Sequence, residues 1–540
     1  MVILRRLPLL SSGLFFLLQF YSTICYAQGQ PAIPRLVQRS GRMQLEVNGQ
    51  PFLILGGELG NSNASEMAYM QPYWAKFDTM HLNTVLAPVY WELLEPEEGR
   101  YDFALVDSLL QTANRKHLKL VLLWFGTWKN SMSCYAPGWV KKDTRRFARA
   151  VNDKGATMEI LSAFSPANRD ADRKAFVALM EHLRQYDSQR SVLMIQVENE
   201  IGMLEAAREK SPAADKAFEG EVPAALIKYL TSNKDVLMPE FRERWAAAGF
   251  RTVGNWETVF GKGLDTDEIF QAWHYAKYAG DIAAAGKKAY PLPMFVNAAL
   301  NHRNVLPGQY PSAGPLPQVM DIWKAAAPAI DLLSPDFYNP RFRYYSDLYI
   351  RGNNTLFIPE IWMHPDNGAK AFYAFGHYHA LGFSPFSIES TNSAGSESIG
   401  KSYAVLEQLV PVLAAIPNDR VEGILLDTAT KKQSVHFGGN TMQVNHDYTL
   451  NWSREASLPN WPEGGVMIVQ LDKDEYIFAG TGFVITFPPS VGILQADEGK
   501  FVNGQWKPGR RLNGDQTHQG RHIRIPVGKW GIQRVKLYSY

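Results

Sequence analysis

The sequence predicts an α/β fold, a (β/α)8 TIM barrel followed by a C-terminal β-sandwich-like domain. Eight short apolar, β-rich segments recur over the first three quarters of the 540 residues, and amphipathic stretches separate them. Beyond about residue 415, turns become frequent and the apolar segments shorten. Strands that alternate with helices form a parallel sheet, and eight such units are the number that closes a barrel.

The segments expected as barrel strands share an apolar, β-branched composition. They are residues 52–57, 84–91, 119–126, 192–198, 294–299, 331–337, 355–361 and 382–388. Before the first of them, Asn48-Gly49 between two apolar runs predicts a tight hairpin. Before the fourth, apolar residues recur from Phe176 to Leu183 at helical spacing. Residues 200–290 form a long, mostly helical insertion that we expect at the mouth of the barrel.

The C-terminal part is expected to be antiparallel. Residues 466–471, 476–480, 483–487 and 523–527 have the composition of short strands, and Asn503-Gly504 predicts a tight turn. We therefore assign residues 28–415 to the barrel and 416–540 to the β-sandwich domain, with the junction near Pro417.

The N-terminus resembles an export signal. Arg5 and Arg6 precede an apolar run over residues 7–18, and a cleavage site is expected after Ala27. The run is too short for a membrane span. Residues 1–27 are thus expected to be a cleaved signal peptide. The remaining chain keeps a single cysteine, Cys134, and an exported chain without disulfides suits the bacterial periplasm or secretion.

Composition excludes several functional classes. Without residues 1–27, which hold two arginines and no acidic residue, the 55 basic and 53 acidic side chains become 53 of each, so nothing favours nucleic-acid binding. The 12 histidines are scattered without zinc-ligand spacing. No Gly-rich phosphate loop is present. We expect no metal and no cofactor, and the sequence leaves the oligomeric state open.

Two strand ends carry the candidate catalytic groups. The fourth predicted strand ends in Glu198, Asn199 and Glu200, and the seventh ends near Glu360. Burying charge at a strand end is costly unless the groups are paired or used. In a (β/α)8 barrel the carboxyl ends of the strands hold the active site. Two carboxylates about 5 Å apart are what a retaining glycosidase requires.

The segment 196–202, Gln-Val-Glu-Asn-Glu-Ile-Gly, resembles the Gln-Val-Glu-Asn-Glu-Tyr-Gly motif of glycoside hydrolase family 35, the β-galactosidases, with Ile201 in place of Tyr. Residues 82–103 resemble a second hallmark, although Pro88 and Glu92 stand where many members have Tyr and Asn. The chain is similar to a bacterial branch with a short C-terminal β domain. The resemblance implies a retaining exo-β-galactosidase, with Glu200 as acid/base and Glu360 as nucleophile.

Six further side chains are candidates for substrate binding. The resemblance implies that Tyr338 hydrogen-bonds the nucleophile. Asn199 is placed to donate to a sugar hydroxyl, and strand-end aromatic residues offer flat walls to a sugar. Glu58 and Glu389 either hold sugar hydroxyls or form structural ion pairs. The full set is Asn199, Tyr338, Trp128 as the preferred stacking wall, Trp91, Glu58 and Glu389.

Two alternatives stay open. One is a retaining β-glycosidase of the same barrel type that acts on another sugar, such as glucose or mannose. The other is an exported glycan-binding protein that kept the barrel and lost turnover.

Overall fold

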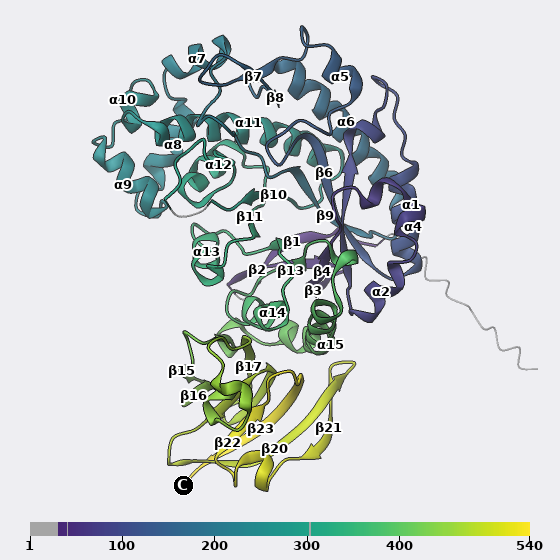
Figure 1. The fold of residues 1–540 in the computed structure, drawn as a ribbon, viewed down its shortest axis with the longest axis vertical. Coiled ribbons are helices and arrows are strands. Elements are labelled where there is room, and N and C mark those ends of the chain that lie inside the picture. The colour runs from purple at the N-terminus through teal and green to yellow at the C-terminus, as the bar shows by residue number, and fades with distance from the viewer. Residues whose placement is uncertain (1–30, 40, 302–303) are drawn as a thin grey trace, which may run out of the picture.

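The barrel is present, and all eight predicted strands take part in it. The computed structural model describes residues 31–39, 41–301 and 304–540, so the expected signal peptide lies outside the described residues. Parallel strands close in the order of the chain (Figure 1). They are β4 (Ile54–Glu58), β5 (Thr84–Tyr90), β6 (Lys119–Lys129), β9 (Val192–Asn199), β10 (Met294–Ala299), β11 (Leu332–Phe337), β12 (Ile358–Ile361) and β13 (Gly382–Pro385).

Helices cover the outside of the barrel. The predicted helix before the fourth strand is α6, which has Pro166 at its first position. It begins after Ser165, whose hydroxyl accepts from the backbone N–H of Asn168. The helices outside the insertion are α1 (Met67–Met70), α2 (Trp74–Thr79), α3 (Trp91–Leu94), α4 (Ala104–Arg115), α5 (Gly138–Lys142), α6 (Pro166–Tyr186), α12 (Met320–Ala326), α13 (Phe342–Tyr349), α14 (Asn367–Gly376) and α15 (Ser393–Ala415). None of the helices in the described ranges is long and apolar enough to cross a membrane.

The long insertion between β9 and β10 is helical, as predicted. It contains α7 (Pro212–Glu219), α8 (Ala224–Ser232), α9 (Pro239–Ala247), α10 (Trp256–Phe260) and α11 (Leu264–Ala289). Most of α11 is buried because it packs along α6 on the outside of the barrel. A short hairpin, β7 (Arg149–Val151) and β8 (Thr157–Leu161), lies in the same upper region of Figure 1.

A small antiparallel sheet precedes the barrel. It contains β1 (Arg35–Arg39), β2 (Arg42–Val47) and β3 (Gln50–Phe52). The predicted hairpin turn is confirmed: Asn48 and Gly49 have φ of 52° and 77°, the left-handed values of a type I′ turn. Residues 50–52 pair with β2, so the first barrel strand begins at Ile54 and not at residue 52.

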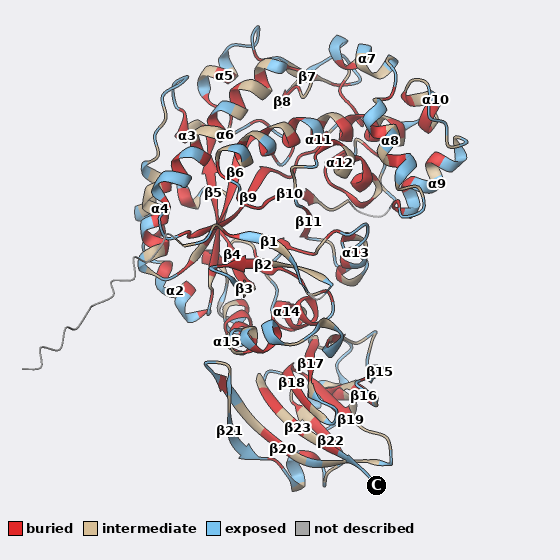
Figure 2. Cartoon of the chain, turned by 180° about the vertical axis from the view of Figure 1, so that it is seen from behind, coloured by how far each residue is buried: buried red, intermediate tan, exposed pale blue. Residues whose placement is uncertain are grey.

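The C-terminal part is a β-sandwich, as predicted. Its six-stranded sheet has the order β14-β17-β18-β23-β20-β21 and its four-stranded sheet the order β15-β16-β19-β22. The Asn503-Gly504 turn joins β20 to β21, an exposed edge strand (Figure 2). The strands are β14 (Val421–Leu426), β15 (Lys432–Phe437), β16 (Asn440–His446), β17 (Gly464–Asp472), β18 (Glu475–Thr481), β19 (Phe483–Thr486), β20 (Val491–Val502), β21 (Gln505–Arg511), β22 (His522–Ile525) and β23 (Gly531–Ser539).

Strands β17 and β18 of the six-stranded sheet are buried on both faces. Ile468 and Phe478 belong to the core between the two sheets, whereas Met467 and Ile477 belong to the barrel core, as strand alternation requires. The barrel-facing side packs against α14 (Figure 1). Close approach needs glycine there: a Cβ on Gly465 would lie 2.3 Å from the carbonyl oxygen of Ala369. The assigned domain boundary near residue 416 stays a prediction.

Candidate functional site

The carboxyl end of β9 is irregular. Glu198 and Glu200 have φ of 61° and 43°, values that non-glycine residues adopt at a cost of about 1–3 kcal/mol. The register between β6 and β9 shifts between Trp124 and Lys129. Regular alternation therefore fails here, and Glu198 and Glu200 have different environments although they are two residues apart.

The two predicted catalytic glutamates converge. One carboxylate oxygen each of Glu200, Asp336 and Glu360 lies within 4.8 Å of the others. Asp336 on β11 pairs directly with Glu360 on β12, and Glu200 follows β9. All three are buried. Because unpaired buried carboxylates are costly, this convergence at the strand ends indicates a site built for chemistry.

Glu360 is held by two hydrogen-bond partners. The Tyr338 hydroxyl donates to its Oε1, as predicted, and a second hydrogen bond joins Glu360 to Glu58 at the end of β4. Burial, and then the charge of Glu200, raise the pKa of Glu360 to about 7, whereas the positive charge of Lys129 and the two hydrogen bonds oppose the rise.

Glu200 is fixed from two neighbouring strands. The Asn130 amide donates to Glu200 Oε2, and Lys129 Nζ donates to Asn130 Oδ1. The backbone N–H of Glu200 donates to Asn297 Oδ1 over 3.0 Å, and Asn297 Nδ2 donates to Asp336 Oδ2 over 2.6 Å. The Asn297 amide thereby orients Asp336 toward Glu200, with which Asp336 forms a further hydrogen bond.

Burial favours the protonated form of two of the four clustered carboxyl groups. Burial, followed by the neighbouring carboxylates, raises the pKa of both Glu58 and Asp336 well above the ordinary range. A protonated carboxyl is a donor, so Glu58 donates to Glu360 and Asp336 donates to Glu200. Each catalytic candidate thus has its own carboxylic acid partner. Glu58 forms this contact in place of the expected ion pair, and its role as a sugar ligand stays a prediction.

Asn199 and Glu389 differ in whether their side-chain polar atoms have hydrogen-bond partners within the fold. Both polar atoms of the buried Asn199 side chain lack a hydrogen-bond partner among the described residues, so the amide is available to a ligand. Glu389 accepts from the Ser387 and Ser390 hydroxyls, each over 3.0 Å, and from Gly60 N over 3.2 Å. Those donors satisfy the Glu389 carboxylate within the fold.

The prediction of Trp128 and Trp91 as sugar-stacking walls is wrong. Both side chains are fully buried at 0% exposure. Trp128 packs against Tyr275 and Tyr278 of α11, because β6 continues to Lys129 and turns the indole outward from the barrel. Trp91 begins α3, and its indole N–H donates to Glu95 Oε2 over 2.8 Å.

Trp362 is a strand-end tryptophan that, unlike Trp91 and Trp128, remains open. Its side chain is 67% exposed, and it lies two residues after Glu360. Its backbone N–H donates to Phe337 O over 3.0 Å, and its carbonyl accepts from Asn367 Nδ2 over 2.9 Å. The backbone is therefore fixed while the indole faces solvent beside the site, which suits an aromatic platform.

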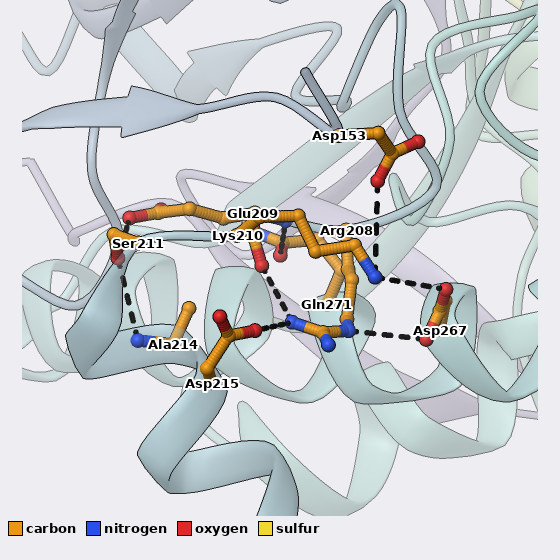
Figure 3. Close-up of polar contacts among 9 residues, drawn as sticks. All are labelled: Asp153, Arg208, Glu209, Lys210, Ser211, Ala214, Asp215, Asp267 and Gln271. Carbon is orange, nitrogen blue, oxygen red and sulfur yellow. Dashed lines mark hydrogen bonds and ion pairs between the residues drawn. The ribbon is translucent and has the colours of Figure 1, made fainter. Parts of the chain in front are cut away.

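The segment that follows Glu200 is anchored away from the barrel by charge (Figure 3). Arg208 is buried and donates to Asp215 Oδ1 over 2.7 Å and to Asp267 Oδ1 over 3.1 Å. Lys210 Nζ lies 3.7 Å from Asp153 and 3.6 Å from Asp267. These contacts join the segment to α7, to α11 and to the turn between β7 and β8.

Between these cations, Glu209 is buried among neutral donors (Figure 3). Its carboxylate accepts from the Ser162 hydroxyl over 2.7 Å and from the Ser211 hydroxyl over 2.5 Å. Its backbone N–H donates to Gln271 Oε1 over 2.9 Å. Burial raises the pKa of Glu209 to about 7. The chain after Glu200 is thus held at both backbone and side-chain level.

Four residues of the site escaped the sequence analysis: Lys129, Asn130, Asn297 and Asp336. The available signal was a polar residue inside an apolar strand, as in 294–299 and 332–337. In the second of these, a period of two also places Asp336 on the side of Tyr338. That signal does not say which polar residues meet, because the ring closure that brings them together is a tertiary property.

Comparison with known proteins gives two family matches. Residues 64–264 match a family described as Beta-galactosidase, and residues 399–524 match a domain of unknown function (DUF5597). Among curated proteins, none matches this chain. The barrel fold and the match over residues 64–264, which covers less than half of the chain, are similar to those of glycoside hydrolases. The resemblance to family 35 gains no support, since the matched family is family 42.

Solved structures share the fold. Gan42B, a GH42 β-galactosidase from G. stearothermophilus, and its catalytic mutant have 11% identity and TM-scores of 0.53 and 0.52, over 90% of this chain and 98% of theirs. The β-galactosidase of the psychrophilic Marinomonas ef1 has 12% identity and a TM-score of 0.47, over 67% of this chain and 62% of its own. That of Bacillus circulans sp. alkalophilus has 13% identity and a TM-score of 0.46. The match spans 62% and 57% of the latter two chains.

Proposed function

We propose that the protein is a retaining exo-β-galactosidase that removes terminal β-D-galactose from oligo- or polysaccharides. The observation that carries the proposal is the approach of Glu200 and Glu360, with carboxylate oxygens within 4.8 Å. Retaining enzymes have carboxyl groups about 5 Å apart, whereas inverting enzymes leave room for a water at about 6.5–9.5 Å. The choice of galactose is supported by the β-galactosidase family match over residues 64–264.

In the proposed mechanism Glu360 is the nucleophile. Its carboxylate attacks the anomeric carbon and forms a glycosyl ester, while Glu200 gives its proton to the departing glycosidic oxygen. Glu200 then removes a proton from the water that cleaves the ester. Tyr338 and Glu58 donate to the Glu360 carboxylate and so favour its ionised form. Asn199, with both polar atoms free, is assigned to a hydroxyl of the sugar.

The assignment of the nucleophile is tested by trapping. A fluorinated galactoside with a good leaving group should label Glu360, and a label on another residue excludes that role. Glu360→Gln should abolish turnover and keep the thermal unfolding transition. The matched control is Glu46→Gln, since Glu46 is also a buried glutamate but lies in β2 and pairs with Arg35 and Arg39. The control should keep turnover.

The acid/base assignment is tested through the leaving group. Glu200→Ala should form the glycosyl ester from substrates with good leaving groups and then stall, because no base activates water. Azide, which attacks without a base, should restore turnover. Undiminished turnover of Glu200→Ala without azide excludes the assignment.

Simple assays separate the proposed activity from a different glycosidase and from a glycan-binding protein. Release of a chromogenic aglycone from aryl β-galactoside but not from aryl β-glucoside or β-mannoside distinguishes the proposal from another glycosidase, and binding without release identifies a glycan-binding protein.

The oxygens of Glu200, Asp336 and Glu360 are also close enough to surround a cation. We expect a chelator to leave turnover unchanged. Loss of activity that a divalent ion restores identifies a metal site instead.

We also propose export of the protein to the periplasm or medium after cleavage behind Ala27, on the basis of the N-terminal sequence. N-terminal sequencing of the mature protein from its bacterial source tests this. A mature chain that still begins with Met1 in the cytosol refutes it.

A further inference from the structure

A second pair of buried carboxyl groups lies behind the site, outside the mechanism described above. Glu198 precedes Asn199 and Glu200 on β9, and Asp172 lies on α6. Both are 0% exposed and hydrogen-bond each other. Glu198 is therefore not a second catalytic acid of the Glu-Asn-Glu triplet, because its side chain is directed to a helix and not to Glu360.

The donors around the pair are distributed unequally. Asp172 Oδ1 accepts from the Trp124 indole N–H over 2.8 Å, and Oδ2 accepts from the Thr127 hydroxyl over 2.5 Å and its N–H over 3.2 Å. Glu198 Oε2 accepts from Trp128 N over 2.7 Å, whereas Oε1 meets no donor group among the described residues. Glu198 also has the backbone N–H of Thr127 and the Asp172 carboxyl as hydrogen-bond partners. Asp172 is thus surrounded by donors on both oxygens, and Glu198 has one oxygen free to carry a proton.

The other charged groups near the pair do not alter this assignment. Tyr278 of α11 shares a 2.7 Å hydrogen bond with the Thr127 hydroxyl, and its pKa is raised well above the ordinary value by burial and by the two carboxyl groups. Arg169 on α6 acts weakly on Tyr278. Burial raises the pKa of both carboxyl groups, and that of Glu198 lies well above the ordinary range because the neighbouring Asp172 adds to the rise. For Asp172, hydrogen bonds from Glu198, Thr127 and Trp124 oppose the rise.

We propose that Glu198 is a permanently protonated carboxylic acid whose hydrogen bond to the Asp172 carboxylate ties the end of β9 to α6 and thereby positions Asn199 and Glu200. Both are positioning residues, and their role in the reaction rests on the proposed function. Glu198 has a left-handed backbone conformation. The register shift between β6 and β9 lies next to the same hydrogen bond. The hydrogen bond provides a contact that offsets that local strain.

The assignment of the proton predicts that the two isosteric variants behave differently. In Glu198→Gln the amide N–H₂ replaces the acid proton as donor to Asp172, and the amide oxygen still accepts from Trp128 N, so stability and kinetics should stay those of the wild type. In Asp172→Asn an N–H₂ group replaces an acceptor and meets Trp124 or Thr127, which also donate. That variant should be destabilised.

The kinetic readout is the dependence on the leaving group. If the end of β9 shifts in Asp172→Asn, Glu200 is displaced from the glycosidic oxygen, and kcat/KM for a substrate with a poor leaving group should fall about 100-fold. An activated aryl galactoside, which needs little acid assistance, should lose far less. If Asp172→Asn does not fold, Thr127→Val, which removes one hydroxyl donor, replaces it in the experiment.

The control is Asp187→Asn at the opposite end of β9. Asp187 is buried and accepts from Ser191 N over 2.8 Å and Val192 N over 2.9 Å. This variant should lose stability without a change in leaving-group dependence. An infrared band of a protonated carboxylic acid, present in the wild type and absent from Glu198→Gln, gives the direct signature.

Equal damage from Glu198→Gln and Asp172→Asn, or an infrared spectrum that Glu198→Gln does not change, overturns the proposal. Leaving-group dependence that is unchanged in Asp172→Asn restricts the pair to stability and overturns the positioning role. The thermal and infrared measurements need no turnover. A wild-type protein without galactosidase activity therefore refutes the proposed function and still tests the proton assignment.

Discussion

The hydrogen bond from Tyr338 to Glu360 leads to a quantitative prediction. In the proposed mechanism Glu360 attacks only as a carboxylate, and its pKa is about 7 with the Tyr338 donor present. A hydrogen bond to a charged group contributes about 1.5–3 kcal/mol, and one pKa unit corresponds to about 1.4 kcal/mol. Tyr338→Phe should therefore raise the pKa of Glu360 by about one to two units, to about 8–9.

The sign of the effect on activity follows from the ionised fraction. On the acid side of the profile, kcat/KM rises with the fraction of Glu360 that is a carboxylate. A higher pKa moves this limb to higher pH, so activity at pH 6 should fall about 10- to 100-fold and recover partly above pH 8. The measurement is kcat/KM for an aryl β-galactoside between pH 5 and 9.

Tyr344→Phe is the matched control. Tyr344 lies on the neighbouring helix α13, is 37% exposed, and contacts Arg341 and Tyr345 through its ring, which the substitution keeps. Its profile should coincide with that of the wild type. An acid limb that does not move in Tyr338→Phe refutes the role of the hydroxyl, even if the activity falls at every pH.

Three further predictions concern binding and stability. Trp362→Ala should raise KM for galactosylated oligosaccharides and leave kcat for a small aryl galactoside unchanged; equal KM values exclude the platform. Gly465→Ala places a Cβ 2.3 Å from the Ala369 carbonyl oxygen and should cost about 1–3 kcal/mol in the free energy of unfolding. Gly138→Ala, where a Cβ meets nothing within 4 Å, is its control, and equal melting temperatures contradict the packing argument. For Glu209, the folded pKa of about 7 exceeds the ordinary 4.5, so its contribution to stability is present below pH 4.5 and lost as pH rises to about 7. The loss is at most about 3 kcal/mol, and Glu209→Gln should remove it from urea unfolding curves at pH 5 and 8; identical curves for variant and wild type refute it.

The strand count was predictable because each barrel strand is an apolar run between helical segments. The residues at which the strands begin and end were less predictable. Residues 50–52 pair with β2 and not with the barrel, and β6 continues past residue 126 to Lys129. Composition does not distinguish which neighbour a strand pairs with, and a register shift such as that between β6 and β9 depends on both partners.

The convergence of Glu200 and Glu360 was predictable, and the residues around them only partly. Glu200 and Glu360 carry charge at the ends of apolar strands, which is a local signal. Trp128 has the same kind of local signal and nevertheless packs in the core, because the orientation of a strand-end side chain depends on where regular pairing stops. Asp336 is a polar residue inside an apolar strand, but this local signal does not say which groups it meets. Its role arises from ring closure, which places β11 beside β12.

The charge balance of the site explains why it contains carboxyl groups other than the two that the proposed reaction uses. Two like charges 4 Å apart repel by about 4 kcal/mol at an effective dielectric constant of 20, so Glu58, Glu200, Asp336 and Glu360 cannot all be ionised beside the single positive charge of Lys129. Protons on Glu58 and Asp336 turn two of the repelling groups into donors. One negative charge then remains on the pair. It lies on Glu360 before the proposed attack and on Glu200 once Glu200 has given up its proton. In the proposed reaction, positive charge that develops on the sugar in the transition state faces the Glu360 carboxylate, and this attraction, which the neutral substrate lacks, stabilises the transition state.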